Sequence, residues 1–193
     1  MSAAAPRPRI VLPAEPLVDG DTALRPWRDS DRPALVSACQ DAEIVRWTAV
    51  PAGYGDADAR AYLRRRFDAT AAALTAPFAI VHAATRDLLG SISLLRFSWE
   101  DARAEVGYWL AREARGAGHA TRAVILICAW GFAALHLERI DLMAATGNPA
   151  SQRVAERAGF TREAVLRSYL LSGSKRQDMV MFGLLRQEVP AGG

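Results

Sequence analysis

The sequence predicts a single domain of the α+β class, and three observations lead to this prediction. The 193 residues are 51% hydrophobic and 23% charged, which suits one globular unit with a full core. Strand-like and helix-like segments follow one another in the order β-α-α-β-β-β-α-β-α-β-β. No internal repeat and no long linker divides them. We therefore expect one domain over residues 19–188, with a flexible N-terminal tail (1–18) and a short C-terminal tail (189–193).

The first half of the chain supplies a strand, two helices and a hairpin. Residues 22–27 form a short strand pattern, and residues 29–40 begin with three N-capping side chains and continue as a helix. A loop rich in glycine and proline precedes an Ala- and Arg-rich helical segment at 56–73. Two apolar strands, 78–83 and 88–97, are separated by a short polar turn, which predicts a hairpin.

The second half alternates strands with two helices. The longer helix carries an apolar stripe made by Val124, Cys128, Gly131 and Leu135, which indicates that one side is buried. The expected elements are a strand at 102–110, a helix at 117–135, a strand at 139–145, a helix from Pro149 that Gly159 ends, and two closing strands at 160–170 and 178–185 around Gly173.

Composition excludes several classes of protein. No run of 18 apolar residues is present, so the sequence predicts no membrane span, and the N-terminus lacks the apolar core of a signal peptide. Cys39 and Cys128 lie in apolar helical surroundings without metal or redox spacing, and we expect both to be reduced core residues. His82, His119 and His136 form no ligand cluster, so no metal site is expected. These features predict a cytoplasmic protein.

The charge of the chain is mildly basic. A net charge of +3 and a sequence pI near 9.2 suit phosphate-bearing ligands or an acidic partner, although a solvated Arg- and Glu-rich surface gives the same numbers. Arg64–Arg66 is the only basic run, and no stacking aromatics are interleaved with it. Nucleic-acid binding is therefore not expected.

The most informative motif is the turn from Arg115 to Ala120, between the strand at 102–110 and the long helix. Gly116 and Gly118 allow the backbone to turn tightly, and the helix that follows presents free N–H groups and the positive end of its dipole. This combination binds phosphate. No Lys-Ser or Lys-Thr follows the glycines, which excludes a P-loop, and Thr121 occupies the third-glycine position of a dinucleotide fingerprint. A glycine turn without a ligand remains the alternative.

The element order and the Arg115-Gly116-x-Gly118-x-Ala120 turn resemble the GNAT acetyltransferase superfamily. The segment Asn148–Phe160, with its Asn-x-x-Ser start and Gly-Phe end, is similar to the ribosomal-protein alanine N-acetyltransferase branch, the RimJ/RimL type. The resemblance covers roughly residues 20–186 and includes the segments 24–27, 41–47 and 176–182. It implies an α/β/α sandwich whose mixed, mostly antiparallel sheet of about seven strands is splayed at the centre.

The resemblance also implies acetyl-CoA as the cosubstrate, without a metal. Backbone groups of the strand end would pair with the pantetheine arm, and the amides of the glycine turn would surround the pyrophosphate. The side-chain amide of Asn148 would contact the pantetheine arm. Asn148 also suits a helix N-cap before Pro149, and these two roles are compatible. The implied cofactor-binding residues are Tyr108, Trp109, Leu110, Arg115, Gly116, Ala117, Gly118, His119, Ala120, Thr121, Asn148 and Ser151.

The implied reaction is direct attack of a neutral amine on the thioester in a ternary complex. Glu105 is the candidate base, acting directly or through water, with a surface carboxylate as the plainer alternative. Many family members carry a tyrosine where this chain has Ala155, so the stabilising donor for the leaving thiolate is assigned to Ser151. A serine at this place can also bond back to the helix backbone.

The acceptor side is the least determined part of the site. Trp47, Tyr54 and Tyr169 are the candidate substrate-binding residues, although Trp47 and Tyr54 are equally suited to core packing. The amine is a peptide or protein α-amine or a small molecule, and the sequence does not separate the two. A non-catalytic acyl-CoA sensor of the same fold is the alternative function. A homodimer through the C-terminal strands is compatible with the sequence.

Overall fold

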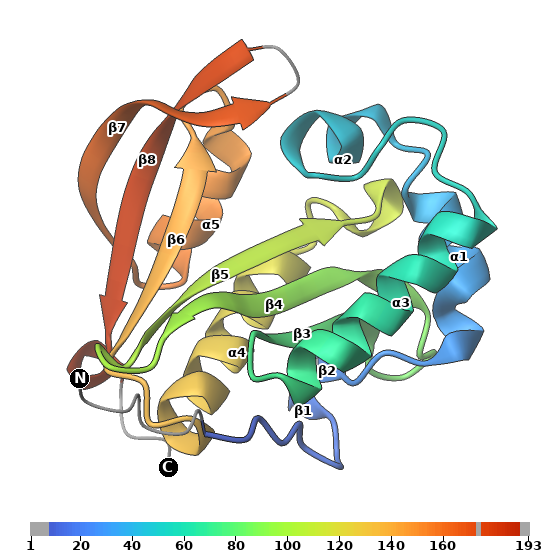
Figure 1. Ribbon diagram of the computed structural model, residues 1–193, viewed down its shortest axis with the longest axis horizontal. Helices are drawn as coiled ribbons and strands as arrows, with labels where there is room; N and C mark the ends of the chain where they lie inside the picture. The colour runs from blue at the N-terminus through green and yellow to red at the C-terminus, as the bar shows by residue number, and fades with distance from the viewer. Residues whose placement is uncertain (1–7, 173–174, 190–193) are drawn as a thin grey trace, which may run out of the picture.

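Eight strands form one sheet in the order β1-β2-β3-β4-β5-β6-β8-β7 (Figure 1). The structure is a computed structural model that describes residues 8–172 and 175–189. Neighbouring strands are antiparallel except β5 and β6, which run parallel. The sheet is therefore mixed and mostly antiparallel, as predicted, with one strand more than expected. The strands are β1 (Leu17–Asp19), β2 (Thr22–Arg25), β3 (Thr75–His82), β4 (Leu88–Ser98), β5 (Arg103–Leu110), β6 (Arg139–Ala145), β7 (Thr161–Ser172) and β8 (Lys175–Leu185).

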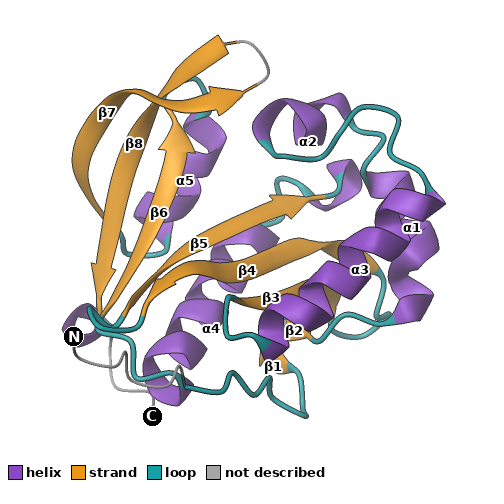
Figure 2. Cartoon of the chain, in the orientation of Figure 1, coloured by secondary structure: helices purple, strands orange, loops and turns teal. Residues whose placement is uncertain are grey.

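Helices cover both faces of the sheet (Figure 2). Helix α4 packs on one face against β1, β2, β4 and β5, while α3 packs on the other face against β3 and carries α1 on its side. Helix α5 lies beside α4 and contacts β6 and β7. The helices are α1 (Arg32–Ala38), α2 (Ala42–Trp47), α3 (Asp56–Ala71), α4 (His119–Ala134) and α5 (Pro149–Arg157).

Each face of the sheet has its own apolar core, because side chains alternate across a strand. On the α4 face, Ile80 and Leu94 are fully buried with Ile127 of α4. On the opposite face, Val81 packs with Leu63 of α3 in a second, smaller cluster. The residues of β5 are divided in the same way, so neighbouring β5 side chains face different helices.

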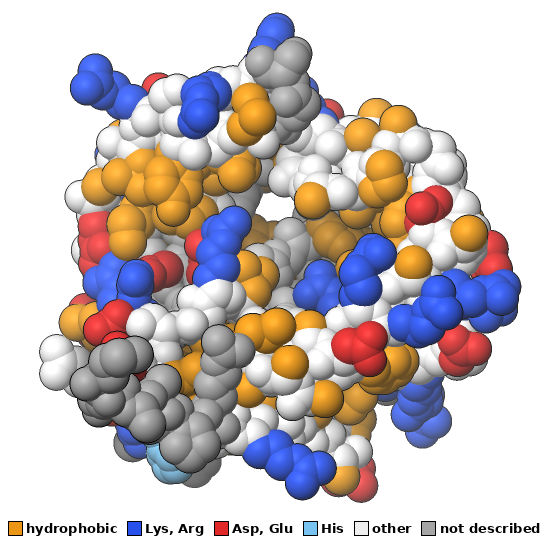
Figure 3. Space-filling view, viewed as in Figure 1, with side chains coloured by type: hydrophobic (Ala, Val, Ile, Leu, Met, Phe, Trp, Pro, Cys, Tyr) orange, Lys and Arg blue, Asp and Glu red, His pale blue; other side chains and the backbone are white. Residues whose placement is uncertain are grey.

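Strands β5 and β6 are joined over only part of their length. Residues Arg103–Val106 pair with Arg139–Leu142. Beyond this point β5 continues along β4 as far as Leu110, and β6 continues along β8 as far as Ala145. The two halves of the sheet therefore part in the direction of α2, as Figure 1 shows, and the space-filling view is hollowed between the β6–β8 arm and the rest of the molecule (Figure 3). The central splay implied by the family resemblance is present.

Gly90 of β4 is required by the close approach of β5. A Cβ at this position would collide with the carbonyl oxygen of Trp109 and lie 3.0 Å from the Cα of Leu110. Since both obstacles are backbone, neither can rotate away. We expect Gly90→Ala to lower the free energy of unfolding by about 1–3 kcal/mol, as measured by urea denaturation. Gly147→Ala is the control, because its Cβ would meet only the Trp47 ring at an ordinary 3.5 Å; equal losses from both variants would contradict this account.

Most predicted elements are confirmed. The hairpin between β3 and β4 closes with the amide of Arg86 donating to the carbonyl of His82 at 2.8 Å. Cys39 and Cys128 are both free and buried, as expected. Within residues 8–172 and 175–189, no helix is long and apolar enough to span a membrane. The predicted turn at Gly173 lies outside the described residues.

Two short elements were not predicted, and part of the predicted tail is packed on the protein. Strand β1 pairs with β2 although its residues begin inside the segment assigned to the tail. Ile10 is only 5% exposed and contributes to the core on the α4 face, because an isoleucine next to an open apolar face gains from burial. Helix α2 is capped by Asp41, whose side chain accepts a hydrogen bond from the Glu43 amide at 2.9 Å. The remainder of the predicted tails, 1–7 and 190–193, lies outside the described residues.

Candidate functional site

The two-glycine loop joins the end of β5 to the start of α4. Gly116 and Gly118 have φ angles of 86° and 85°, in the left-handed region that glycine adopts without strain. Gly118 is the N-cap residue of α4, so the first amides of a 16-residue helix follow directly. These amides have no acceptor within their own helix. The loop and the helix start therefore present unpaired amides next to the splay, an arrangement that suits an anion.

The Arg115 side chain folds back toward the protein. Its guanidinium lies 2.5 Å from the carboxylate of Asp41 and donates to the carbonyl oxygen of Leu110 at 3.0 and 3.3 Å. Arg115 thus ties the loop to the end of β5 and to the N-cap of α2. Its positive charge already has a partner in Asp41, so the groups left for an anion here are mainly backbone amides.

The start of α4 is fixed from the other side by β2. The ring Nδ1 of His119 lies 2.8 Å from the hydroxyl oxygen of Thr22, and the His119 side chain is buried. Arg122 pairs with Asp21 at 3.1 Å and donates to the carbonyl of Ala117 at 3.0 Å. Because its ring is engaged in this way, His119 offers a ligand its backbone amide.

A hydrogen bond joins the two sides of the splay. The hydroxyl oxygens of Tyr108 on β5 and Ser151 on α5 lie 3.1 Å apart. Burial raises the pKa of Tyr108 to about 12, against the smaller opposing effect of the Ser151 hydrogen bond. Tyr108 is therefore a neutral hydroxyl below that pH. The Asn148 side chain accepts the Ser151 amide at 3.1 Å, which confirms the N-cap expected before Pro149.

Ala155, where many family members carry a tyrosine, is fully buried in the core of the α4 face. The tyrosine hydroxyl that contacts Ser151 in this chain comes from Tyr108 of β5. From the sequence, Tyr108 is expected to bind the cofactor through its backbone; the contact of its hydroxyl with Ser151 is not predicted. Alternation along β5 was the available signal, since Val106 and Tyr108 share the α4 face.

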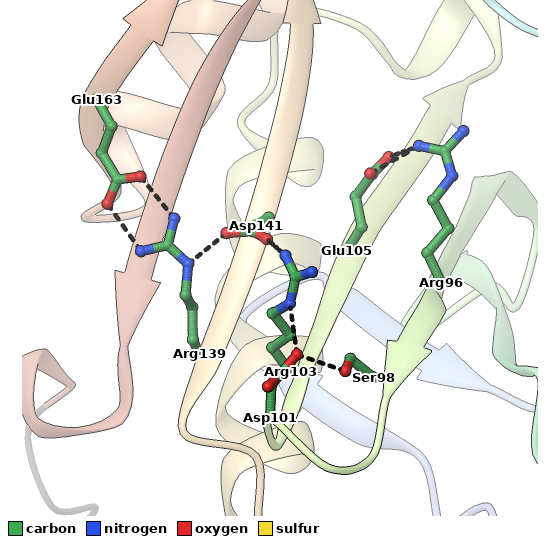
Figure 4. Close-up of polar contacts among 8 residues, drawn as sticks. All are labelled: Arg96, Ser98, Asp101, Arg103, Glu105, Arg139, Asp141 and Glu163. Atoms are coloured by element: carbon green, nitrogen blue, oxygen red, sulfur yellow. Dashed lines mark hydrogen bonds and ion pairs between the residues drawn. The ribbon is translucent and has the colours of Figure 1, made fainter.

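Glu105 points to the opposite face of β5 from Tyr108. Its two oxygens accept hydrogen bonds from Nη1 of Arg96 at 2.6 and 2.7 Å (Figure 4). The Glu105 side chain is 18% exposed and lines a cavity of about 170 Å³ bordered by β4, β5, β6, β7 and β8. Tyr169 of β7 and Asp141 of β6 also line this cavity. Glu105 is therefore an accessible carboxylate at the base of the splay, with an arginine as its partner.

A network of ion pairs joins β5, β6 and β7 (Figure 4), and Arg103 and Asp141 of this network also line the cavity. Asp141 accepts from Nε of Arg139 at 2.6 Å and from Arg103 at 3.4 Å. Arg139 also makes a bidentate pair with Glu163 of β7, with distances of 2.9 and 2.6 Å. The hydrogen bonds from Arg139 hold the pKa of Glu163 below its ordinary value. Each charge of this network has a partner, so the network has a structural role where β5 and β6 are still paired.

The three expected acceptor-side aromatics lie in different environments. The Trp47 ring of α2 stacks under Arg46 and reaches the loop after β6, since a Cβ at Gly147 would lie 3.5 Å from its Cη2 atom. Tyr54 is 5% exposed and packs in the smaller core cluster, and burial raises the pKa of its hydroxyl. Tyr169 is 51% exposed at the rim of the cavity beside Glu105. Of the two alternatives for Tyr54, core packing is the one observed.

A larger cavity of about 410 Å³ lies elsewhere, between the segment 9–12, Pro26–Trp27, residues 66–71 of α3 and Pro77. Its lining contains no carboxylate, imidazole or thiol. The carboxylate of Glu105 and the hydroxyls of Tyr108 and Ser151 lie instead around the splay. In the described part of the chain, no group of His, Cys, Asp and Glu side chains is placed to hold a metal ion.

Comparison with known proteins identifies a family. Residues 22–161 match the family described as Acetyltransferase (GNAT) domain. The Bacillus subtilis protein YdaF, named as a candidate ribosomal N-acetyltransferase, is 38% identical over 101 residues, which make up 52% of this chain and 55% of that protein. The match thus spans about half the length of this curated relative.

Solved structures share the fold. Mycobacterium smegmatis RimJ in complex with CoA-disulfide has a TM-score of 0.81 at 22% identity, covering 90% of this chain and 86% of that one. Spermidine N-acetyltransferase from Vibrio cholerae, in complex with CoA and spermine, has a TM-score of 0.75 at 19% identity, covering 87% and 97% of the two chains. At these identities the likeness concerns the fold.

Proposed function

This chain belongs to the GNAT acetyltransferase family, and on that basis we propose that it transfers an acetyl group from acetyl-CoA to a primary amine. The observation that carries the proposal is the parting of β5 and β6 next to the two-glycine loop. The free edge of β5 can pair with an extended arm, and the start of α4 can bind a pyrophosphate. A long thioester with a pyrophosphate at its far end, such as acetyl-CoA, fits both features at once.

Glu105 and Tyr108, on opposite faces of β5, act on different groups in the proposed reaction: Glu105 on the amine and Tyr108 on the leaving sulfur. The amine nitrogen bonds to the thioester carbonyl carbon, the carbon–sulfur bond breaks, and the sulfur leaves as a thiolate. Glu105 takes the proton that the nitrogen loses, directly or through water. The pair of hydroxyls on Tyr108 and Ser151 stabilises the thiolate by donating a hydrogen bond to it. The contact between the two hydroxyls supports the role assigned to Ser151 and adds Tyr108 to that role.

Removing the Tyr108 hydroxyl is expected to slow turnover without weakening cofactor binding. Tyr108→Phe and Ser151→Ala should each lower kcat by about 10- to 100-fold, the range for a hydrogen bond to a charged group. Because the two hydroxyls form one pair, the double variant should lose little more than either single variant. Since burial raises the pKa of Tyr108 to about 12, wild-type turnover should not decline through Tyr108 ionisation in the neutral and mildly alkaline range. A Tyr108→Phe enzyme with wild-type kcat would remove this hydroxyl from the mechanism.

The acceptor is either a peptide or protein α-amine or a small-molecule amine. The names of YdaF and of the Vibrio cholerae spermidine enzyme represent these two classes among the similar proteins. The cavity beside Glu105, with Tyr169 at its rim and Trp47 across the splay, is where we place the amine. The homodimer and the cytoplasmic location expected from the sequence stay predictions.

Isothermal titration with acetyl-CoA, followed by a thiol-release assay with a panel of amines and N-terminal peptides, tests the proposed function. We expect saturable binding and amine-dependent release of CoA. Binding without release from any amine would favour the alternative, a non-catalytic acyl-CoA sensor. Absence of binding would remove both.

A further inference from the structure

Arg96 has an unusual backbone conformation for a strand residue. Its φ angle is 53°, and the register of β4 against β5 shifts between Leu95 and Ser98, which marks a β-bulge. A non-glycine residue in this left-handed region costs about 1–2 kcal/mol. Bulges often occur next to active sites, where they redirect a side chain.

The bulge determines which face of the sheet Arg96 reaches. Ile92 and Leu94 of β4 face α4, so regular alternation would place Arg96 on the same apolar face. Instead Phe97 packs on that core, and Arg96 is the extra residue that turns toward Glu105. The strained backbone therefore serves to bring a guanidinium to the candidate base.

The pair between Arg96 and Glu105 has two consequences for the proposed reaction. While both oxygens of Glu105 accept hydrogen bonds from Arg96, the ammonium group of an acceptor must compete with Arg96 for them. Arg96 itself is 57% exposed, so it can move away into solvent without unfolding the strand. In contrast, Asp141 in the same cavity is fixed by Arg139 and Arg103. An acceptor entering the cavity can therefore break the ion pair between Arg96 and Glu105 more easily than the ion pairs of Asp141.

We propose that Arg96 selects acceptors that carry a carboxylate a few bonds from the reacting amine. On binding, the acceptor's ammonium group replaces Arg96 at Glu105, while its carboxylate replaces Glu105 at Arg96. Both ion pairs are exchanged rather than lost, and Glu105 becomes free to act as the base. An amine without a carboxylate cannot complete the exchange, because it leaves Arg96 without a partner. This inference rests on the proposed function, since it concerns the acceptor of the same site.

Matched acceptors test the proposal and separate the two sources of the carboxylate. One pair is a peptide with N-terminal glutamate against the same peptide with N-terminal glutamine. The other is a free amino acid against its amide. We expect the acidic member of at least one pair to have a kcat/KM about 10- to 100-fold higher, the range for a charge-assisted hydrogen bond.

Substitution of Arg96 should abolish this preference. Arg96→Asn removes the charge and tolerates the left-handed backbone, whereas Arg96→Lys keeps the charge and should retain part of the preference. Arg86→Asn is the matched control, because Arg86 is an exposed arginine with a φ angle of 66° in the β3–β4 turn. Its preference should equal that of the wild type.

Titration of each acceptor pair into the CoA complex adds a readout that does not need turnover. Tighter binding of the acidic member by wild type, lost in Arg96→Asn, supports the proposal. Equal binding and equal kcat/KM within both pairs overturn it. If amines without a carboxylate are acetylated as fast as the acidic acceptors, the transferase function stands and the role of Arg96 is refuted. If no amine causes release of CoA, the proposed function itself is refuted.

Discussion

Glu105→Gln is expected to lower kcat by about 10²–10³-fold near neutral pH, within the range for loss of a general base. The side chain keeps its size, and its partner Arg96 is half-exposed, so the fold should be preserved. Acetyl-CoA affinity should stay close to that of the wild type, because Glu105 lies on the acceptor side of β5. The measurement is steady-state thiol release, with acetyl-CoA binding by titration on the same preparation.

The pH dependence distinguishes a base from a structural carboxylate. An alkyl ammonium has a pKa near 10, so a variant without a base must wait for the small fraction of free amine. The deficit of Glu105→Gln should therefore be largest well below the amine pKa and shrink as the pH approaches it. Glu163→Gln is the control, since Glu163 belongs to the neighbouring ion-pair network but pairs with Arg139. If the deficit were constant across pH, Glu105 would not be the proton acceptor.

Gly118→Val is expected to weaken acetyl-CoA binding by at least about 100-fold. A β-branched residue is an outlier at a φ of 85°, and its Cβ would lie 3.3 Å from Nη1 of Arg122, which itself braces the loop. The loop must therefore rearrange, and the amides at the start of α4 lose their common orientation. Titration with acetyl-CoA measures the effect directly.

Gly159→Val separates backbone strain from loss of the anion site. Gly159 follows α5 with a φ of 90°, and a Cβ there would have its nearest neighbour at an ordinary 3.9 Å. Both variants should lose similar stability, about 1–2 kcal/mol, yet only Gly118→Val should lose acetyl-CoA affinity. An equal loss of affinity in both would mean that strain alone explains the result.

Elements with strong local signals could be predicted from the sequence. The two-glycine turn, the Asn148 cap and the apolar stripe of α4 each depend on a few neighbouring residues, and each is observed. Strand β1 and helix α2 were missed because three and six residues carry little periodicity. Asp41, as an N-capping residue, was the available signal for α2.

The partners of the site residues could not be predicted in the same way. Arg96 contacts Glu105 only because of the register of the sheet. Asp41 contacts Arg115 only because of the way α2 packs. The bulge at Arg96 has a weak trace in the sequence, an arginine between Leu95 and Phe97 that breaks the strand pattern. Predicting hydrogen-bond partners that are distant in sequence requires the fold, whereas caps and turns can be predicted from neighbouring residues.

Initial rates of CoA release, with acetyl-CoA and an amine both varied, show whether the acetyl group passes directly from the thioester to the amine. Direct attack across the splay requires both substrates to be bound together. We expect release that depends on the amine and double-reciprocal lines that intersect. Parallel lines, the mark of a covalent acetyl-enzyme, would contradict direct attack.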